Sequence, residues 1–260
     1  MKAMILAAGL GTRLRPLTDD RPKALVTVGG RTLLDIALAR LRYFGVREVI
    51  VNTHHHADMV REYLRANDSF GMRVEVSPET VLLDTGGGLK HAAQFFLERA
   101  DVSDSSESYE PFVLHNVDVI SNIDLGRMIR FHTEQAALAT LAVQERRTSR
   151  YLLFDGSSQL CGRRAGGTAS EDDSRRELGR PAHGVLALAF CGIHVISTEI
   201  FEKMRQEGSF SIIDTYLQLA ERGEKVVAFR ADDCRWRDLG TPQSLAAAEL
   251  EIARGVYRES

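Results

Sequence analysis

Apolar residues along this chain alternate between short continuous runs and longer amphipathic stretches. The continuous runs predict buried strands at Lys2–Ala7, Glu48–Asn52, Arg73–Ser77 and Phe112–Leu114. Between them, apolar residues recur at helical spacing, which predicts helices at Thr32–Phe44, Ala57–Ala66, Gly88–Ala100 and Leu125–Glu134. A repeated strand–helix order favours right-handed crossovers and a largely parallel sheet that is covered on both faces.

The pattern changes after about residue 137, where less helix separates the strands. Further strands are predicted at Ala137–Val143, Tyr151–Phe154 and Val185–His194, and a last helix at Gln243–Arg254. Two segments, Ser103–Glu110 and Arg164–Ala182, are poor in apolar residues and are expected to be exposed loops. We expect the later strands to extend the same sheet as a mixed sheet rather than to form an independent second domain.

Composition narrows the class of protein. The 260 residues include 33 Lys and Arg against 36 Asp and Glu, a net charge of −3, so no overall basic field favours nucleic acid or a membrane surface. The apolar runs are too short to span a bilayer, and the N-terminus shows no signal-peptide pattern. Cys161, Cys191 and Cys234 are odd in number and widely spaced, which predicts free thiols. We expect a soluble cytoplasmic protein.

Small residues follow the first predicted strand, in a segment Leu6–Thr18 that reads Leu-Ala-Ala-Gly-Leu-Gly-Thr-Arg-Leu-Arg-Pro-Leu-Thr. Ligands of open α/β sheets bind beside the carboxyl ends of the strands, and glycine lets the backbone approach a polyanion closely. Arg13 offers a planar fork for phosphate oxygens, and Lys23 a compact charge. Between residues 9 and 31, five basic residues stand against two acidic ones. We predict a phosphate-binding loop; the alternative is a solvated surface loop.

The order of residues in this segment resembles the N-terminal signature of the sugar-1-phosphate nucleotidylyltransferases. That signature is G-x-G-x-R, then P-L-T, then P-K, and the matching residues are Gly9, Gly11, Arg13, Pro16-Leu17-Thr18 and Pro22-Lys23. The resemblance continues through Asp84–Gly88, Asn116–Asp118 and Trp236–Thr241, and therefore covers nearly the whole chain. Within the family, the chain is most similar to short members that act on N-acetylmuramate 1-phosphate or mannose 1-phosphate.

The resemblance implies an α/β fold, a Rossmann-like three-layer αβα sandwich with a mostly parallel mixed sheet, which is the nucleotide-diphospho-sugar transferase fold. We predict a single nucleotidyltransferase domain over residues 1–260. Its nucleotide-binding half would cover about 1–136 and its sugar-phosphate-binding half about 137–260. Because the chain ends soon after Gly240-Thr241, a C-terminal β-helix is not expected.

The resemblance also implies an activity: transfer of a nucleoside monophosphate from an NTP to a sugar 1-phosphate with release of pyrophosphate, for nucleotide-sugar biosynthesis serving the cell envelope. Arg13 would hold the β- and γ-phosphates, and Lys23 would neutralise the α-phosphate and the incoming phosphate. The residues implied in nucleotide binding are Leu6, Ala7, Ala8, Gly9, Gly11, Thr12, Arg13, Lys23, Glu79, Thr85 and Gly86. Without the resemblance, the glycines after Thr85 are equally well explained as an ordinary helix start.

Two aspartates are candidates for a metal site. Asp118 follows an apolar strand, and Asp238 lies in a tight turn before the last helix. Transfer between two anionic reactants needs cations, and Mg²⁺ is usually held by one or two carboxylates with phosphate oxygens. The resemblance implies that Asp118 and Asp238 share Mg²⁺, although each alone is more often a turn residue or a helix cap. Val117 stands where the family commonly has glycine, and Ile120 argues against the Asp-x-Asp pair of a glycosyltransferase.

Substrate specificity is only partly indicated. Asn116 and Gly192 are candidates for contacts with the sugar, whereas Asp214 is either structural or a contact with the sugar phosphate. Glu79 falls where relatives read the edge of the base. A carboxylate only accepts hydrogen bonds, so it would favour UTP, dTTP or GTP over CTP and ATP. The alternative is that Glu79 is a solvated loop residue.

Two rival functions remain at this point. A phosphocholine cytidylyltransferase of the same fold would use aromatic residues to hold the trimethylammonium group, and Trp236 lies beside a candidate metal ligand. A non-catalytic sensor of nucleotide sugars would not need the phosphate and metal groups, all of which are present. The run His54–His56 looks like a metal site, but adjacent histidines point in different directions after a strand. The sequence does not determine the oligomeric state.

Overall fold

The computed structural model describes residues 1–98, 110–166, 176–178, 180 and 182–257. Its main strands are β1 Lys2–Leu6, β4 Glu48–Thr53, β5 Arg73–Pro78, β6 Pro111–Asn116, β8 Ala139–Gln144, β9 Arg150–Phe154, β10 Leu160–Ala165, β11 Arg176–Leu178, β12 Leu186–Ser197 and β13 Val226–Arg230. Two short pairs accompany them: β2 Thr27–Val28 with β3 Arg31–Thr32, and β7 Val119–Ser121 with β14 Trp236–Asp238.

The helices are α1 Leu33–Tyr43, α2 Ala57–Ala66, α3 Asp84–His91, α4 Ala93–Leu97, α5 Leu125–Glu134, α6 Ile200–Lys203, α7 Ile212–Glu221 and α8 Pro242–Ala253. Helices α1, α2, α5 and α8 follow the predicted amphipathic stretches closely, whereas α6 and α7 were not predicted. Side chains at the N-caps help to fix where four of these helices begin: Thr32, Asp124, Ser211 and Thr241 each accept a hydrogen bond from a backbone N–H in the first turn of α1, α5, α7 and α8.

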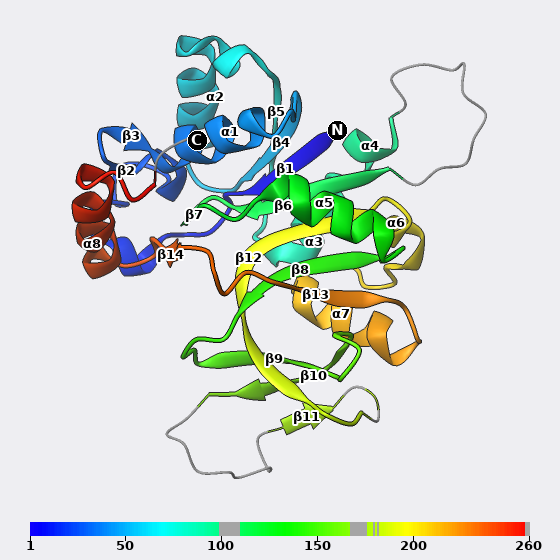
Figure 1. The fold of residues 1–260 in the computed structure, drawn as a ribbon. Helices are drawn as coiled ribbons and strands as arrows, with labels where there is room; N and C mark the ends of the chain where they lie inside the picture. The colour runs from blue at the N-terminus through cyan, green and yellow to red at the C-terminus, as the bar shows by residue number, and fades with distance from the viewer. Residues whose placement is uncertain (99–109, 167–175, 179, 181, 258–260) are drawn as a thin grey trace.

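Ten strands form one sheet, in the order β11-β10-β9-β12-β6-β1-β4-β5, with β8 between β12 and β13 (Figure 1). Strands β6, β1, β4 and β5 pair in parallel, so their carboxyl ends meet at one edge of the sheet. Strand β12 runs antiparallel to β6, β8 and β9. The strands after residue 137 therefore extend the same sheet as a mixed sheet, as the sequence predicted.

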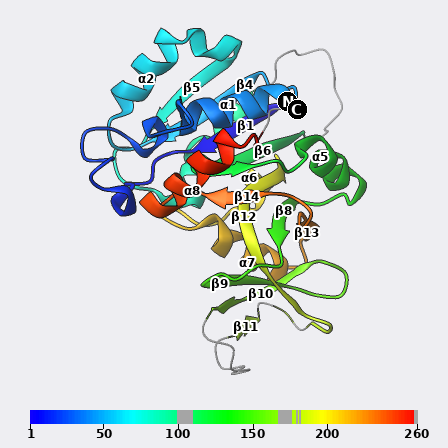
Figure 2. The ribbon, with the colours of Figure 1, turned by 60° about the vertical axis from the view of Figure 1, so that its left-hand side comes forward.

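Both faces of the sheet are covered. Ala3 and Ile5 of β1 pack into a core cluster with α1, α5 and α8, whereas Met4 between them packs into a second cluster with α3, α4 and α7. Figure 2 shows α1 and α8 together on one side of the sheet. Strands and helices thus form three layers, which confirms the predicted αβα sandwich.

The predicted bounds of the helix at Gly88–Ala100 are wrong. Helix α3 begins four residues earlier, and the chain bends at Ala92 before α4. Glycines are poor helix formers, but the backbone N–H groups of Gly86 and Gly87 both donate to the carbonyl of Phe210, at 2.9 and 3.2 Å. This long-range contact stabilises a helix start that the local pattern does not show.

The exposed loop predicted at Arg164–Ala182 is also partly wrong. Strand β10 continues to Ala165, and β11 pairs with it in antiparallel register. Because β11 has no apolar alternation, only its pairing with β10, the strand before it in the chain, identifies it. The loop predicted at Ser103–Glu110 lies outside the described residues except for Glu110.

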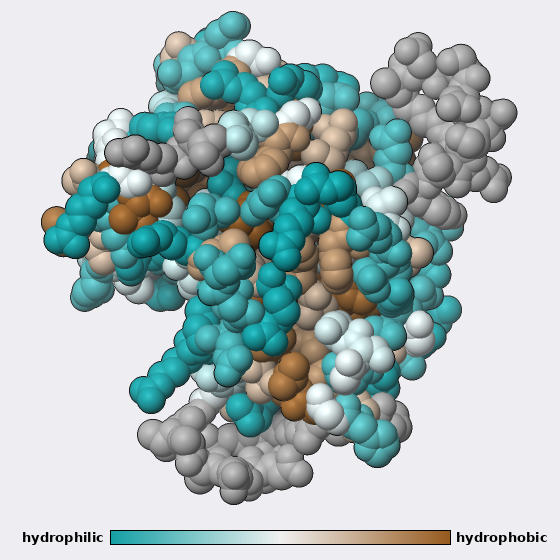
Figure 3. All heavy atoms as spheres, viewed as in Figure 1, coloured by the Kyte–Doolittle hydropathy of each residue, from teal (hydrophilic) through white to brown (hydrophobic). Residues whose placement is uncertain are grey.

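The surface viewed in Figure 3 is mainly hydrophilic toward its edges, with hydrophobic residues visible nearer the centre. Within the described residues, no helix has the length and apolar character needed to cross a membrane. Cys161 and Cys191 are buried free thiols, as predicted, and Cys234 is a half-buried one.

Candidate active site

The loop after β1 folds back on itself. Gly11 adopts a left-handed conformation, with φ of 64°, and a Cβ there would lie 2.9 Å from Cγ2 of Thr18. The hydroxyl of Thr18 donates to the carbonyl of Gly11 at 2.9 Å. Glycine at position 11 is therefore required by the fold, because any side chain would be strained and would collide with Thr18. The Cβ of Lys23 would lie 3.3 Å from the same Cβ at position 11, so Lys23 packs against this loop.

Gly9 differs from Gly11, because nothing in the fold requires a glycine at position 9. Its φ lies outside the left-handed region, and a Cβ at this position would meet no atom within 4 Å. Gly9 is exposed at the carboxyl end of β1. A glycine that the fold does not need is explained if a ligand approaches the backbone closely at this point.

Lys23 and Asp118 form an ion pair at the same edge of the sheet. The ammonium Nζ of Lys23 contacts Oδ2 of Asp118, and the two side chains are only 12% and 13% exposed. Lys23 begins a short helical turn, Lys23–Leu25, whereas Asp118 lies between the ends of β6 and β7. Two residues 95 positions apart in the sequence are thus brought together by the parallel strands.

Asp238 lies beside this pair. Strand β14 pairs with β7 so that Asp238 is opposite Val119, and the backbone N–H of Leu239 donates to the carbonyl of Asp118 at 2.7 Å. The backbones of the two aspartates are therefore fixed relative to each other. The structure brings Asp118 and Asp238 together, as the sequence reasoning required for a shared cation.

Arg13 lies over the turn that follows Asp238. A Cβ at Gly240 would be 2.6 Å from Nη2 of Arg13 and 2.7 Å from Oδ1 of Asp238. The backbone N–H of Gly240 donates to the same carboxylate oxygen at 2.8 Å. Gly240 thus gives the Arg13 guanidinium room beside Asp238, and any side chain at position 240 would displace one of them.

A cavity of about 320 Å³ opens at this edge of the sheet. Eight of the predicted site residues line it: Leu6, Ala7, Ala8, Gly9, Lys23, Thr85, Asn116 and Asp118. An adjoining cavity of about 240 Å³ shares the loop and Lys23, and adds Arg15, Arg21, His55 and His56. The other predicted residues, namely Gly11, Thr12, Arg13, Glu79, Gly86, Gly192 and Asp238, do not line the larger cavity.

Sequence reasoning missed Asn52, the residue that holds the loop to the sheet. Its Oδ1 accepts from the backbone N–H of Ala7 at 2.8 Å, and its Nδ2 donates to Oε1 of Glu79 at 2.7 Å. The second oxygen of Glu79 accepts from the backbone N–H of Leu83 at 3.0 Å. The sequence did offer one signal, because Asn52 is the last residue of the strand predicted at Glu48–Asn52, and ligands of α/β sheets bind at such strand ends. The structure adds that Asn52 is buried.

The role predicted for Glu79 changes as a result. The side chain is 4% exposed, so the alternative of a solvated loop residue is wrong. Both carboxylate oxygens already accept hydrogen bonds from the protein, and a Cβ at Gly88 would lie 2.6 Å from one of them. This arrangement favours a role in holding Asn52 and the segment before α3 in place over direct reading of the base.

The glycines after Thr85 serve packing. A Cβ at Gly86 would lie 2.5 Å from the ring of Phe210, and one at Gly87 would lie 2.3 Å from the carbonyl of Gly208. The hydroxyl of Thr85 accepts from the backbone N–H of Ile212 at 3.0 Å. These contacts attach α3 to the segment before α7, and only Thr85 of this motif reaches the larger cavity as well.

Asn116 and Gly192, the two candidates for sugar contacts, lie against each other. A Cβ at Gly192 would be 2.7 Å from Nδ2 of Asn116, and Gly192 has φ of 70°. Behind them, His115 is fully buried, and its Nδ1 is 2.8 Å from the carbonyl of Asn116. Burial lowers the pKa of His115 to about 4, so its ring is neutral at pH 7 and adds no charge next to Asp118.

Trp236, the aromatic candidate for holding a trimethylammonium group, already has a partner. The guanidinium of Arg146 lies 3.7 Å above the ring centroid of Trp236, so one face of that ring already holds a cation. Among the residues that the structure describes, no aromatic side chain lines the larger cavity. Together these facts argue against an aromatic cage for trimethylammonium.

Asp214 pairs with Arg163 on the surface, at 2.6 Å.

The histidine run is divided among different contacts. Nδ1 of His54 is 2.9 Å from the carbonyl of Glu79, whereas His55 and His56 line the smaller cavity. Over the part of the chain that the structure describes, no group of three or more His, Cys, Asp or Glu residues is arranged to hold a metal. Any metal at Asp118 and Asp238 would therefore need further ligands from the substrates.

Comparisons with known proteins agree with this site. The family model described as Nucleotidyl transferase matches residues 2–158. The chain is 34% identical over 254 residues to the N-acetylmuramate alpha-1-phosphate uridylyltransferase of Caulobacter vibrioides, covering 96% of both proteins. It is 28% identical over 258 residues to the protein of the same name from Neisseria meningitidis, covering 96% of this chain and 97% of that one.

Solved structures show the same fold. HddC from Yersinia pseudotuberculosis, complexed with GMP-PN, matches with a TM-score of 0.71 and 20% identity, over 96% of this chain and 99% of that one. The family model covers more than half of this chain, and the Caulobacter relative aligns along nearly its whole length. The loop signature, the two aspartates and these matches agree: the chain belongs to the nucleotidyl transferase family, among its sugar-1-phosphate nucleotidyltransferases.

Proposed function

We propose that this protein transfers a nucleoside monophosphate from an NTP to a sugar 1-phosphate and releases pyrophosphate. The observation that carries the proposal is the placement of Lys23, Asp118 and Asp238 beside the Gly9 loop, at the carboxyl ends of parallel strands. Both reactants are anions, so the reaction depends on cations and alignment more than on a proton-transfer base.

The protein's own groups supply charge and position. The ammonium of Lys23, held against Asp118, balances the charge of the α-phosphate and of the attacking sugar phosphate. Arg13, beside Asp238, neutralises the β- and γ-phosphates of the leaving pyrophosphate, and Arg15 and Arg21 line the adjoining cavity. Ala8 and Gly9 bring the backbone close to the phosphates. Together these groups favour the transition state, in which negative charge is spread over the transferring phosphoryl group.

Asp118 and Asp238 have the donor atoms that suit Mg²⁺. In each carboxylate one oxygen already has a protein partner: Lys23 for Asp118 and the N–H of Gly240 for Asp238. The other oxygen of each accepts no hydrogen bond within the described residues, so it is available to a hard cation. When bound, Mg²⁺ would polarise the α-phosphate and screen the charge of both reactants.

We further propose UTP as the preferred nucleotide and N-acetylmuramate 1-phosphate as the first acceptor to test, with a role in making cell-envelope precursors. This rests on the names of two relatives that align with the chain over nearly its full length. GTP is the second candidate, because the HddC structure was obtained with a guanosine nucleotide analogue. Val117, which lines the cavity, narrows the space near Asn116 and is expected to influence the choice of sugar.

The proposal is tested by measuring pyrophosphate release from a panel of NTPs and sugar 1-phosphates with Mg²⁺. The expected result is UTP-dependent release that requires a sugar 1-phosphate and stops when EDTA is added. Phosphocholine with CTP serves as the matched alternative pair, and release from that pair alone would overturn the proposal. Nucleotide-sugar binding without release from any pair would instead identify a sensor.

A further inference from the structure

Arg146 lies at the same edge of the sheet as the candidate active site. Strand β8 runs antiparallel to β12, and β12 runs antiparallel to β6, so β8 has the same direction as β6. The carboxyl end of β8 therefore lies at the edge that carries Asn116 and Asp118, and Arg146 follows this end. A cation thus stands at a strand end on the predicted sugar side of the site.

Trp236 holds this arginine in place. The guanidinium of Arg146 lies 3.7 Å from the centroid of the Trp236 ring. Trp236 and Asp238 are alternate residues of β14, so their side chains lie on the same face of that strand. The indole Nε1 of Trp236 donates to the carbonyl of Cys191 at 2.7 Å, and Cys191 directly precedes Gly192. The ring that carries Arg146 thus joins the strand of a candidate metal ligand to the strand of a candidate sugar contact.

Within the described residues, no carboxylate pairs with Arg146. Glu145 and Asp232, the acids in this part of the chain, both pair with Arg230, at 3.4 and 2.5 Å. Nη2 of Arg146 donates to the carbonyl of Phe190 at 2.7 Å and its Nε is buried, so Nη1 is the nitrogen left for a ligand. Because Arg146 is half-buried, its attraction for an anion is less weakened by water than that of an exposed arginine.

The acceptors considered for this protein differ in charge on the sugar ring. N-acetylmuramate 1-phosphate carries a carboxylate on the lactyl ether at C3, whereas N-acetylglucosamine 1-phosphate has a hydroxyl group there and is otherwise identical. In the proposed reaction the 1-phosphate lies at Lys23 and Asp238. From Asp238 to Trp236 the strand spans about 7 Å, which a pyranose ring and its C3 substituent bridge.

We infer that Arg146 binds a carboxylate on the sugar of the acceptor and thereby selects acidic sugar 1-phosphates over neutral ones. The inference rests on the proposed function and names the substrate class of the same site. A charge-assisted hydrogen bond from Nη1 supplies the preference, and the Trp236 ring keeps the guanidinium in position for it.

The test compares acceptors that differ only in this charge, because Arg146 also packs against Trp236 and its loss would weaken any acceptor if that packing alone mattered. Pyrophosphate release with UTP and Mg²⁺ is measured for N-acetylmuramate 1-phosphate and for its methyl ester at the lactyl carboxylate. In the wild type, kcat/KM for the acid should exceed that for the ester about ten-fold or more. In Arg146→Met the ratio should fall to within about two-fold of one, mainly through a higher KM for the acid.

Two further variants serve as controls. Arg147→Met removes the exposed neighbouring charge and should keep the wild-type ratio. Arg146→Lys keeps a charge but not the planar fork, so its ratio should lie between those of the wild type and Arg146→Met. An equal ratio in the wild type and Arg146→Met would overturn the inference, and so would a loss of the ratio in Arg147→Met alone.

The inference and the proposed function fail in different ways. Pyrophosphate release from neutral sugar 1-phosphates alone would support the proposed function and overturn the role of Arg146. If no acceptor supports release, the proposed function fails, and the role of Arg146 is decided by isothermal calorimetry with UDP-N-acetylmuramate and its methyl ester, which needs no turnover. Tighter binding of the acid that disappears in Arg146→Met supports the role. Equal affinity for the two ligands, or binding of neither, overturns it.

Discussion

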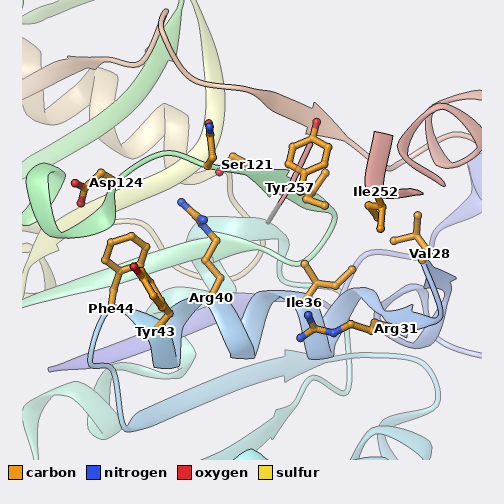
Figure 4. Close-up of a pocket in the computed structure, with 13 residues that line it drawn as sticks. Val28, Arg31, Ile36, Arg40, Tyr43, Phe44, Ser121, Asp124, Ile252 and Tyr257 are labelled. Atoms are coloured by element: carbon orange, nitrogen blue, oxygen red, sulfur yellow. The ribbon is translucent and has the colours of Figure 1, made fainter. Parts of the chain in front are cut away.

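The candidate active-site cavity and the packing of α1 against β7 both involve the segment 116–124, yet they differ in how their polar groups are used. In the candidate active site, Lys23 pairs with Asp118, and Asn52 joins the loop to Glu79. Between α1 and β7 (Figure 4), the hydroxyl of Ser121 and Nε of Arg40 are buried without a hydrogen bond to any described residue. One region is held in shape by its own contacts, whereas the other leaves buried polar groups unpaired.

This difference leads to opposite expectations for the two regions. A pre-organised site keeps its charges in place for the reaction, because reorganisation during the reaction would cost rate. Buried polar groups without a partner cost stability instead, so removing one of them should stabilise the fold. The predictions below test whether the two regions differ in this way, beginning with the largest effect.

Replacing either aspartate is expected to have the largest effect. Asp118→Asn and Asp238→Asn should each lower Mg²⁺-dependent turnover by at least about 10³-fold, because a neutral amide is a poor ligand for a hard cation. The double variant should be little worse than either single one, since both changes dismantle one site. Asp124→Asn, which keeps the side-chain oxygen that caps α5, is the control and should retain activity. Normal turnover in Asp118→Asn would rule out the metal role.

Lys23→Ala should lower turnover by roughly 10²–10³-fold while the fold survives, because its ammonium serves charge in the transition state. The loss should appear mainly in kcat. Lys203→Ala, which removes a surface lysine paired with Glu224, is the control for a lost ion pair and should change turnover less than two-fold. Retention of more than about a third of wild-type activity by Lys23→Ala would contradict the assigned role.

The sequence predicted the residues that line the candidate active-site cavity better than it predicted the packing of α1 against β7. Gly9 and Asp118 follow strands with clear apolar patterns, so their convergence follows from a parallel sheet. Lys23 joins them because the loop after β1 folds back on itself. The contact of Arg40 with Ile123 and the burial of Ser121 have no such signal, because no local pattern connects these residues.

The same limit explains the errors in the fold. Helix α2 and helix α5 were predicted with their observed bounds, because each has one strongly apolar face. The start of α3 was missed, because it depends on hydrogen bonds to Phe210, far along the chain. The hydrogen bond between Glu79 and Asn52 was not predicted either, since Asn52 lies on another strand. The local apolar pattern predicted which segments form helices and strands, but not the long-range contacts that determine where they begin and end.

Gly9→Ala separates a glycine needed for function from one needed for the fold. No atom lies within 4 Å of a Cβ at this position, so the melting temperature should stay within about 1 °C of the wild type. Turnover should fall about ten-fold or more if phosphates approach the backbone there. Gly156→Ala, in an exposed turn with only an ordinary contact at 3.9 Å, should change neither quantity. Full activity in Gly9→Ala would remove the argument for close backbone approach.

Glu79→Gln tests how the nucleotide is held. An amide at position 79 would point its NH₂ group at either Nδ2 of Asn52 or the N–H of Leu83, both of which are donors. We expect the free energy of unfolding to fall by about 1–2 kcal/mol. The ratio of kcat/KM for UTP over CTP should stay within about two-fold, because both oxygens of Glu79 already bind the protein. A ten-fold fall in that ratio would instead support direct reading of the base.

Ser121→Ala should have the smallest effect, and it should be of opposite sign. Its hydroxyl is buried and has no partner among the described residues, so its removal relieves a desolvation cost and should raise the free energy of unfolding by about 1 kcal/mol. Ser211→Ala is the matched control: that hydroxyl accepts from the backbone N–H of Ile213 as the N-cap of α7, so its loss should cost about 1 kcal/mol. Urea denaturation measures both.

The two serine variants together decide whether the packing of α1 against β7 carries an unsatisfied group. Basal turnover of Ser121→Ala should match the wild type, because the hydroxyl contacts neither aspartate. A more stable protein with unchanged turnover would show that this region, unlike the candidate active site, is not held in shape by its polar contacts. A loss of about 1 kcal/mol or more in Ser121→Ala would show that the hydroxyl has a partner, and the contrast between the two regions would disappear.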